Sequence, residues 1–385
     1  MTDVSPHVLV IRRRYLGDVV LLGSVLRNLR LHWPDAQITV LTEAGYTGIL
    51  ALNPDVNASL AFPKSLIPWL SFIRTLRRAR FTHVLDFDNT EKTALVTRLT
   101  GALVRATFNR ELIPFRYGSF YTHVAKVTND FYDSHHITET YLALLPAIGV
   151  PVVSREVRLV PRPADLASSA KLLGRPVSSL RSATSDQRSP NSAPISDLRP
   201  SNSAPLTSRP APFASPKKVL LHPGSRSPYR IWPPERFAAV CDRLQDELNA
   251  QVFVVAGPGE QALVKQIREH AKSHLIALEQ QLTVGQFAGL LAQFDLFLCH
   301  DSGPMHIAAA VGTPVVALFG SQNATIWRPL GPRQTVLQTT LPCVCLGTAA
   351  TPTPCEPGNS YRSYCVRKLT EDEVFAAIAA QLAPR

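Results

Sequence analysis

The chain has 385 residues, of which 45% are apolar and 18% charged, and its formal net charge is +11. Such a length accommodates two domains with separate cores, and the composition is that of an ordinary globular protein. The excess of basic residues favours an acidic partner, either a phosphorylated substrate or an anionic membrane surface. The basic residues are scattered and are not interleaved with aromatic residues, so no nucleic-acid partner is expected.

We expect neither a membrane span nor a secretion signal. No apolar run reaches the ~20 residues that a membrane-spanning helix needs. Near the N-terminus the arginines follow the apolar run 8–11, which is the reverse of a signal peptide. We therefore expect a cytoplasmic protein, with reduced cysteines, that can contact the inner face of the cytoplasmic membrane.

The first half of the chain alternates strand-like and helix-like segments. An apolar run bounded by charge at 7–12 predicts a buried parallel strand. Helical spacing of apolar residues follows at 18–31, a second strand at 37–42, a further strand at 83–88 and a helix at 93–102. Strands that alternate with helices predict a parallel sheet with right-handed crossovers.

The second half repeats this alternation. Strands that run into turns are expected at 218–225, 250–260, 294–303 and 313–321, and helices at 233–248, 282–294, 304–311 and 369–382. The last helix opens with a capping box, Thr370 followed by Glu373. The predicted fold class is α/β, with two tandem doubly wound, Rossmann-like domains at 1–160 and 218–385.

Residues 161–217 are predicted to be a disordered, Ser/Pro-rich insert or linker. From Pro176 to Pro216 the sequence has no Gly or Lys and many Ser and Pro residues. Such a segment buries too little apolar surface to order itself. A passive linker is the favoured reading, and a phosphorylated or partner-binding tract is the alternative.

The loop at 300–304 is the strongest candidate for a ligand site. Gly303 allows a tight turn, and Pro304 suits the first position of a helix. The next backbone amides, those of Met305, His306 and Ile307, together with the helix dipole favour a diphosphate. Asp301 can accept hydrogen bonds from sugar hydroxyls. Alternatively, Ser302 only caps the helix and His306 is a satisfied buried histidine.

Two further loops follow strands of the same predicted sheet. Ser225, Arg226 and Arg230 form a set that suits phosphate, although a solvated turn is the alternative. Glu260, after a Gly-rich turn, is placed to accept from a ribose or adenine group. Three such loops on one sheet predict a nucleotide-sugar site.

In the N-terminal half, Gly17 and Asp18 lie between the first strand and the first helix. Asp18 is either a helix cap or a general base that faces the gap between the domains. Arg13 and Arg14, with Lys92, could clamp carboxylate or phosphate groups of an acceptor, or form a solvated basic rim.

Four motifs resemble glycosyltransferase family 9, the heptosyltransferases of lipopolysaccharide core assembly. They are VLVIRRRYLGDVVLLGSVLRNLR, HPGSRSPYRIWPPERF, VVAGPGE and HDSGPMHIAAAVGTPVVALFG. The resemblance implies a GT-B arrangement, in which two Rossmann-like domains face a cleft. It also implies an inverting transfer of heptose from ADP-heptose, bound by the C-terminal domain, to an anionic glycolipid acceptor, without metal or cofactor.

The resemblance assigns roles to individual residues. Asp18 matches the catalytic base, Asp301 the sugar-contacting aspartate, and Gly303 and His306 the diphosphate side. Ser225 and Glu260 match donor-contacting positions, and Lys92 matches a basic acceptor-side position. Arg230 stands where a lysine is common, and Asp88 where a glutamine is more usual. A nucleotide-sugar epimerase of the same form and a non-catalytic nucleotide-sugar-binding protein are the alternatives.

Four of the six cysteines lie close together near the C-terminus: Cys343, Cys345, Cys355 and Cys365. Their number would suit a zinc or iron site. The single residue between the first two differs from the usual zinc spacing, so a reduced or structural cluster is expected and no metal site is predicted.

Overall fold

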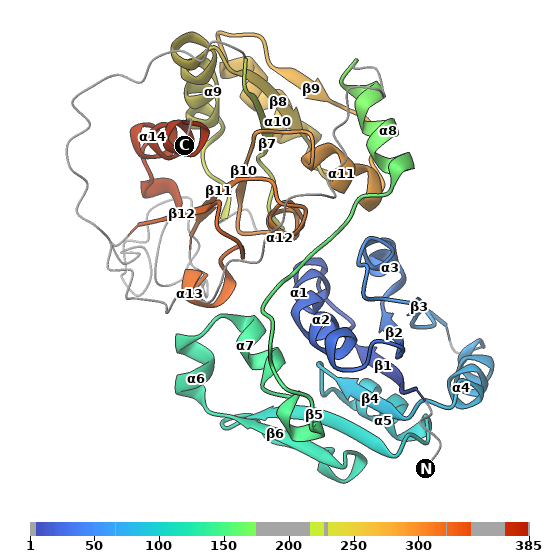
Figure 1. Cartoon of the computed structure of the whole chain (residues 1–385). Coiled ribbons are helices and arrows are strands. Elements are labelled where there is room, and N and C mark those ends of the chain that lie inside the picture. Colours follow the sequence, from blue (N-terminus) through green and yellow to red (C-terminus); the bar gives the residue numbers. More distant parts are fainter. Residues whose placement is uncertain are drawn as a thin grey trace.

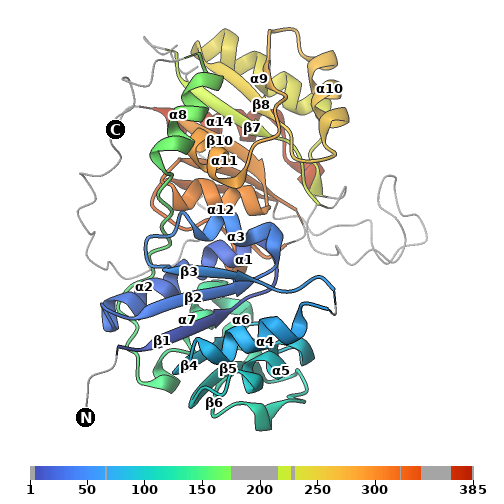
Figure 2. The ribbon, with the colours of Figure 1, turned by 90° about the vertical axis from the view of Figure 1, so that its right-hand side faces the viewer.

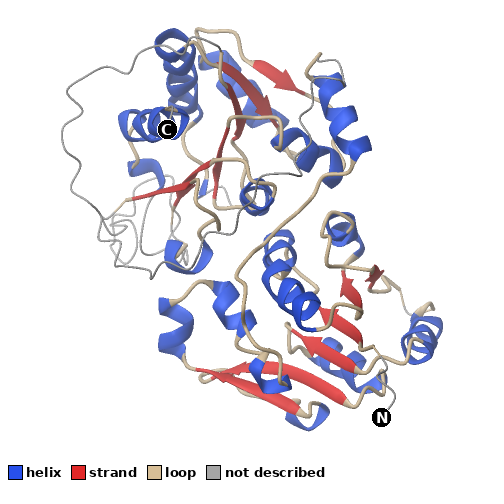
Figure 3. Ribbon diagram, in the orientation of Figure 1, coloured by secondary structure: helices blue, strands red, loops and turns tan. Residues whose placement is uncertain are grey.

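Each half of the chain forms one parallel six-stranded sheet that is covered by helices (Figure 1). The computed structural model describes residues 5–65, 67–174, 216–226, 230–320, 322–339 and 366–383. Strands and helices alternate along both halves (Figure 3). The expected cysteine cluster, Cys343 to Cys365, lies outside the described residues.

The N-terminal domain holds the first six strands. Its elements are β1 His7–Ile11, α1 Leu16–Leu21, α2 Gly23–His32, β2 Gln37–Thr42, a 3-10 turn Ala44–Tyr46, α3 Thr47–Leu50, β3 Ala58–Ala61, α4 Trp69–Arg78, β4 His83–Asp86, α5 Glu91–Leu99, β5 Val104–Arg110, a 3-10 turn Gly118–Phe120, β6 His123–Val127, α6 Asn129–Ser134, α7 Ile137–Leu142 and a 3-10 turn Pro146–Ile148.

The C-terminal domain holds the other six strands. Its elements are α8 Pro163–Leu172, β7 Lys218–His222, α9 Pro234–Leu248, β8 Gln251–Val255, α10 Gln261–His270, β9 Ile276–Leu278, α11 Val284–Leu291, β10 Leu296–His300, α12 Gly303–Ala310, β11 Val315–Phe319, α13 Ala324–Trp327, β12 Gln334–Gln338, a 3-10 turn Val366–Lys368 and α14 Glu371–Leu382.

The two sheets have the same strand order. The first runs β3-β2-β1-β4-β5-β6, and the second, read from its other edge, runs β9-β8-β7-β10-β11-β12. This is the doubly wound order, which confirms the predicted fold class. In such sheets ligands bind at the carboxyl ends of the strands where the order reverses, between β1 and β4 and between β7 and β10.

The predicted helix at 18–31 is two helices. α1 ends at Leu21 and α2 begins at Gly23, with Leu22 between them. The apolar periodicity continues through the break, so the sequence pattern does not reveal it. At the other end of the chain the predicted capping box is confirmed, since the Thr370 hydroxyl accepts from the Glu373 amide and the Glu373 carboxylate accepts from the Thr370 amide.

The prediction starts the disordered segment at residue 161, but residues 163–172 form a helix. α8, Pro163–Leu172, packs against α11 of the C-terminal domain. The Ser169 hydroxyl donates to the carbonyl of Gln286 at 2.8 Å, and the Gln286 amide donates to the Ser168 hydroxyl at 3.0 Å. The C-terminal domain therefore includes α8. The rest of the predicted insert, 175–215, lies outside the described residues.

An extended segment, 150–162, connects the domains and is fixed by hydrogen bonds. The buried Asn28 side chain of α2 accepts from the amides of Val153 and Ser154 and donates to the carbonyl of Ser154 at 2.7 Å. Further along, the Leu159 amide donates to the carbonyl of Ala310 at the end of α12. The segment thus attaches to both domains.

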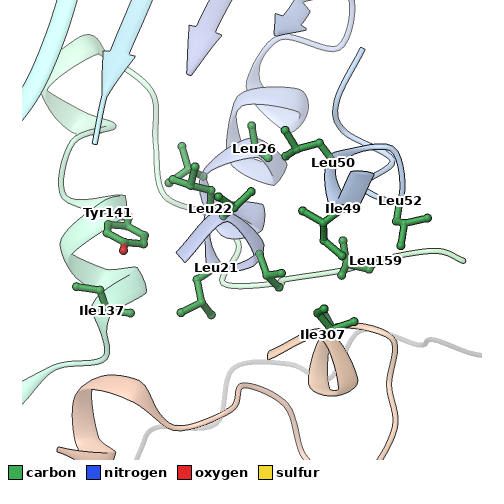
Figure 4. Packing of buried hydrophobic residues seen from close by; sticks show 14 of the residues in the cluster. Leu21, Leu22, Leu26, Ile49, Leu50, Leu52, Ile137, Tyr141, Leu159 and Ile307 are labelled. Atoms are coloured by element: carbon green, nitrogen blue, oxygen red, sulfur yellow. The ribbon is translucent and has the colours of Figure 1, made fainter. Parts of the chain in front are cut away.

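The domains meet where the first turns of α1 and α12 touch. A Cβ atom on Gly17 would lie 2.7 Å from Cδ2 of His306, and one on Gly303 would lie 3.1 Å from Cβ of Leu16. Both glycines are therefore required by the close approach of the two helices. Buried apolar side chains of the two domains form one continuous cluster beside this contact, and Ile307 of α12 points toward Leu159 (Figure 4).

We expect Asn28→Ala to lower the free energy of unfolding by about 1–3 kcal/mol, because it removes three hydrogen bonds between the buried Asn28 side chain and the backbone of Val153 and Ser154. Chemical denaturation measures the change. Ser71→Ala is the control, since its exposed hydroxyl makes a single hydrogen bond to the carbonyl of Pro68 and its loss should cost less than about 0.5 kcal/mol. Equal effects of the two substitutions would contradict the role given to Asn28.

Gly17→Ala should separate the domains, because the added methyl group overlaps the His306 ring. We expect a loss of about 1–3 kcal/mol, as in other overpacked contacts. Differential scanning calorimetry reports the loss, and small-angle X-ray scattering reports the separation. Gly48→Ala is the matched control, since a Cβ there meets nothing within 4 Å. The interpretation fails if both variants keep the wild-type melting temperature and radius of gyration.

Candidate functional site

Asp18 lies in the first turn of α1 and is held by three donors. Its exposed fraction is 6%. Oδ1 accepts hydrogen bonds from the Tyr141 hydroxyl at 2.6 Å and from the Arg12 guanidinium at 2.5 Å, and Oδ2 accepts from the amide of Tyr15 at 3.1 Å. Both predicted roles of Asp18 are compatible with this geometry, since Oδ2 caps the helix and Asp18 also lines a cavity between the domains.

Arg12 links Asp18 to the end of β4. Its guanidinium donates to the carbonyl of Phe87 at 2.7 Å and forms an ion pair with Asp88 at 3.2 Å. Burial alone would lower the pKa of Arg12, but Tyr141, Asp18 and Asp88 outweigh it and raise the pKa. Burial also raises the pKa of Asp88 to about 6, against the opposing effect of Arg12. Arg12 therefore stays charged and joins the two strands at the reversal point of the first sheet.

Asp301 and Arg230 form an ion pair at the reversal point of the second sheet. The Arg230 guanidinium lies 3.0 Å from Oδ2 of Asp301. Asp301 follows β10, and its exposed fraction is 9%. Burial raises the pKa of Asp301 to about 6, and the positive charges of Arg230 and Arg226 oppose that rise. Near neutral pH the carboxylate is mostly ionised and can accept hydrogen bonds.

The structure does not match the alternative in which Ser302 only caps the helix and His306 is a satisfied buried histidine. Ser302 occupies the N-cap position of α12, but its side chain makes no capping bond and its hydroxyl donates to the carbonyl of His300 at 3.2 Å. His306 is buried, and its Nδ1 has no hydrogen-bond partner among the described residues. Burial lowers the pKa of His306 to about 4, although Asp18 acts against this. The imidazole is therefore neutral and unsatisfied.

The prediction of free amides at Met305, His306 and Ile307 is wrong for Met305 and for Ile307, since Ile307 lies past the first turn of a helix that begins at Gly303 and donates within that helix. The Met305 amide donates to the carbonyl of Ser302 at 3.1 Å, because the first turn of the helix is tight.

Glu260 occupies the N-cap position of α10 and faces the glycine turn after β7. Its carboxylate accepts from the amide of Gly257 at 2.7 Å and lies 3.3 Å from Nε2 of His222. A Cβ atom on Gly224 would lie only 1.9 Å from Cδ of Glu260, so a larger residue there would have to displace the Glu260 carboxylate. Burial lowers the pKa of His222, although Glu260 opposes the effect.

These residues line one cavity of about 690 Å³ between the domains. From the N-terminal domain it receives Arg12, Tyr15, Leu16, Gly17, Asp18, Tyr46 and Tyr132. From the C-terminal domain it receives Ser225, Arg226, Arg230, Glu260, Asp301, Ser302, Gly303, Pro304 and His306, with other residues. All eight donor and catalytic residues predicted from the sequence are thus brought together.

A neighbouring cavity of about 660 Å³ was not predicted. It shares Leu16, His222, Gly257, Pro258 and Pro304 with the first cavity and extends between α10 and α11. Its walls are mainly apolar, from Val255, Val264, Leu278, Val284, Phe287 and Ile307, with Lys265 and Arg268 among the lining residues. Its size and apolar walls suit a flat aromatic group such as a nucleobase.

The predicted acceptor residues, Arg13, Arg14 and Lys92, line neither cavity but lie together. The guanidinium groups of Arg13 and Arg14 lie 2.9 and 3.0 Å from Oε1 of Glu43. The Lys92 ammonium lies 5.1 Å from the ring centre of Phe62, which Arg13 also covers. Burial and the charge of Arg13 lower the pKa of Lys92. We name Arg13, Arg14, Lys92 and Glu43 the acceptor-side cluster.

Comparison with known proteins agrees with this geometry. The family model described as "Glycosyltransferase family 9 (heptosyltransferase)" matches residues 69–349. The chain is 24% identical to Lipopolysaccharide heptosyltransferase 3 of Escherichia coli over 328 residues, which cover 82% of this chain and 84% of the relative.

Two solved structures share the fold. The glycosyl transferase family 9 protein from Veillonella parvula DSM 2008 has a TM-score of 0.75 at 19% identity, covering 99% of this chain and 98% of the other. The E. coli ADP-heptose lps heptosyltransferase II has a TM-score of 0.71 at 19% identity, covering 98% of each chain. The two facing Rossmann-like domains form the GT-B arrangement, and the chain belongs to glycosyltransferase family 9, the heptosyltransferases.

Proposed function

We propose that this protein transfers a heptose from ADP-heptose to a lipopolysaccharide core, or a related anionic glycolipid, with inversion and without a metal or cofactor. One observation supports the proposal most directly. Asp18, from the N-terminal domain, lines the same cavity as Asp301, Gly303 and His306 from the C-terminal domain. A proton acceptor and a set of groups suited to a diphosphate sugar thus face each other across one space.

The two adjoining cavities fit the two ends of the donor. The apolar cavity between α10 and α11 would hold the adenine, and Glu260, at the junction, would accept from the ribose. The diphosphate would lie at the start of α12, where the helix dipole and Ser225, Arg226 and Arg230 favour negative charge. His306, neutral at pH 7, would donate a hydrogen bond to the diphosphate but no positive charge.

The chemical step then follows from the position of Asp18. Its carboxylate would take the proton of an acceptor hydroxyl while the hydroxyl oxygen forms a bond to the anomeric carbon. The bond from that carbon to the diphosphate oxygen breaks, and ADP leaves with the electron pair. Attack from the side opposite the diphosphate inverts the anomeric centre. The positive groups at the start of α12 would stabilise the charge on the departing ADP.

The acceptor-side cluster would bind the anionic part of the acceptor. Arg13, Arg14 and Lys92 outnumber the single carboxylate of Glu43, so positive charge remains for phosphate or carboxylate groups. An acceptor that is anchored in lipid also requires that the enzyme work at a membrane surface. We therefore place the protein in the cytoplasm, in peripheral contact with the inner membrane.

Asp18→Asn tests the reaction, because it keeps the shape of the side chain and removes the proton acceptor. We expect the rate of heptose transfer to fall about 10²–10⁴-fold while ADP-heptose affinity is retained. Radiolabelled transfer and calorimetry measure the two quantities. Asp35→Asn, at an exposed position, is the control. A protein that turns ADP-heptose over without acceptor would be an epimerase, and one indifferent to Asp18→Asn in every assay would be a binding protein.

The raised pKa of Asp301 predicts how the stability of the protein depends on pH. Its folded-state pKa, about 6, lies above the ordinary value of 3.8, so the folded protein binds the proton more tightly than the unfolded chain. This residue's contribution to stability therefore decreases as pH rises from about 4 to about 6. Relative to Asp301→Asn, the wild type should lose stability on the order of a few kcal/mol over that range. Denaturation at several pH values measures the difference, and a constant difference would contradict the assignment.

A further inference from the structure

The outer face of α4 exposes large apolar side chains to solvent. Leu70, in its first turn, is 72% exposed, and Ile67, just before the helix, is 91% exposed. The opposite face is packed, since Leu76 is fully buried and the Trp69 and Phe72 rings lie 5.5 Å apart edge to face. α4 is therefore held against the domain by one face, while Leu70 and the preceding Ile67 remain uncovered.

The same helix lies in a strongly basic part of the chain. From Val56 to Leu85 the sequence has no acidic residue and five basic ones: Lys64, Arg74, Arg77, Arg78 and Arg80. Arg74 and Arg77 follow Leu70 by four and seven residues and are exposed, so they share its face of the helix. Exposed Ile67 and Leu70 beside arginines on the same face combine the apolar and cationic groups that bind a protein to an anionic bilayer.

α4 is also next to the proposed acceptor site. The Lys92 ammonium of the acceptor-side cluster lies 5.0 Å from the ring centre of Trp69, in the first turn of α4. The connection from β3 to α4 projects from the N-terminal domain at the right of Figure 2. An occupant that covers Ile67 and Leu70 would therefore lie beside the groups that are proposed to bind the acceptor.

We propose that this face of α4, with Ile67, Leu70, Arg74 and Arg77, docks the protein on an anionic lipid bilayer. The apolar side chains would enter the boundary of the acyl chains, and the arginines would contact lipid phosphates. Among the described residues no helix is long and apolar enough to cross a bilayer, so the contact is a surface one. The inference rests on the proposed function in one respect, since the contact would give the enzyme access to a lipid-anchored acceptor.

Vesicle sedimentation of the full chain tests the proposal. The vesicles contain equal parts of phosphatidylglycerol and phosphatidylcholine, or phosphatidylcholine alone, and no glycolipid. We expect the wild type to bind the anionic vesicles and to be released by salt. The double variant Ile67→Ser, Leu70→Ser should bind on the order of ten-fold more weakly, and Arg74→Gln about five-fold more weakly.

Val153→Ser is the matched control. Val153 is 66% exposed, and its amide donates to Asn28 of α2, which packs on the opposite face of the first sheet from α4. Its substitution should leave vesicle binding unchanged. The proposal is overturned if the wild type does not bind anionic vesicles, which would favour a protein partner on α4, or if Val153→Ser weakens binding as much as the double variant does.

Transfer to a delipidated core oligosaccharide separates this proposal from the proposed function. The double variant should retain wild-type transfer to that soluble acceptor, because neither Ile67 nor Leu70 lines a cavity of the site. Loss of transfer with normal vesicle binding would count against the proposed function alone. A wild type that transfers heptose but does not bind vesicles would overturn the docking surface alone.

Discussion

The contact between the first turns of α1 and α12 determines how this site works. Each helix starts directly after a central strand of its own sheet, and each domain presents the positive end of a helix dipole to the other. Gly17 and Gly303 allow the backbones to approach so closely that Asp18 and His306 share one desolvated space. In such a space a carboxylate and a hydrogen-bond donor act more strongly on a substrate than they would in water. The proposed binding of a donor and the orientation of the proposed base, Asp18, thus depend on the same interdomain packing.

The two carboxylate oxygens of Asp18 have different hydrogen-bond partners and therefore different roles. Oδ1 is occupied by Tyr141 and by Arg12, which also holds the end of β4 through Asp88. From the described residues Oδ2 accepts one backbone hydrogen bond, so it retains capacity to accept from a hydroxyl in the cavity. Two strong donors on one oxygen orient the carboxylate and leave the other oxygen with its single backbone hydrogen bond. The arrangement suits a base that must be oriented but must also remain free to receive a proton.

The sequence predicted the parts of this site that lie at strand ends and not the parts that tertiary packing supplies. Asp18, Asp301 and His306 stand in turns between a buried strand and a helix, where residue type and position together indicate a ligand site. Tyr141 is 123 residues away from Asp18 and reads as an ordinary core aromatic residue until the fold brings its hydroxyl to the carboxylate. The boundary between α1 and α2 was missed for a related reason, since the apolar periodicity runs through it. Local sequence patterns were therefore enough to predict the topology. Contacts between side chains that are far apart in the sequence are visible only in the structure.

The acceptor side differs from the donor side in how its charged groups are buried and paired. On the donor side Arg230 and Asp301 form a buried ion pair, whereas on the acceptor side Arg14 is exposed and shares one carboxylate with Arg13. A buried pair selects a ligand of defined shape, because any group left unpaired there is costly. A shared, solvated carboxylate can be exchanged at little cost for the phosphate of an acceptor. With the basic face of α4 beside this cluster, the proposed bilayer contact would keep the N-terminal domain on a lipid surface while the C-terminal domain exchanges ADP for a new donor.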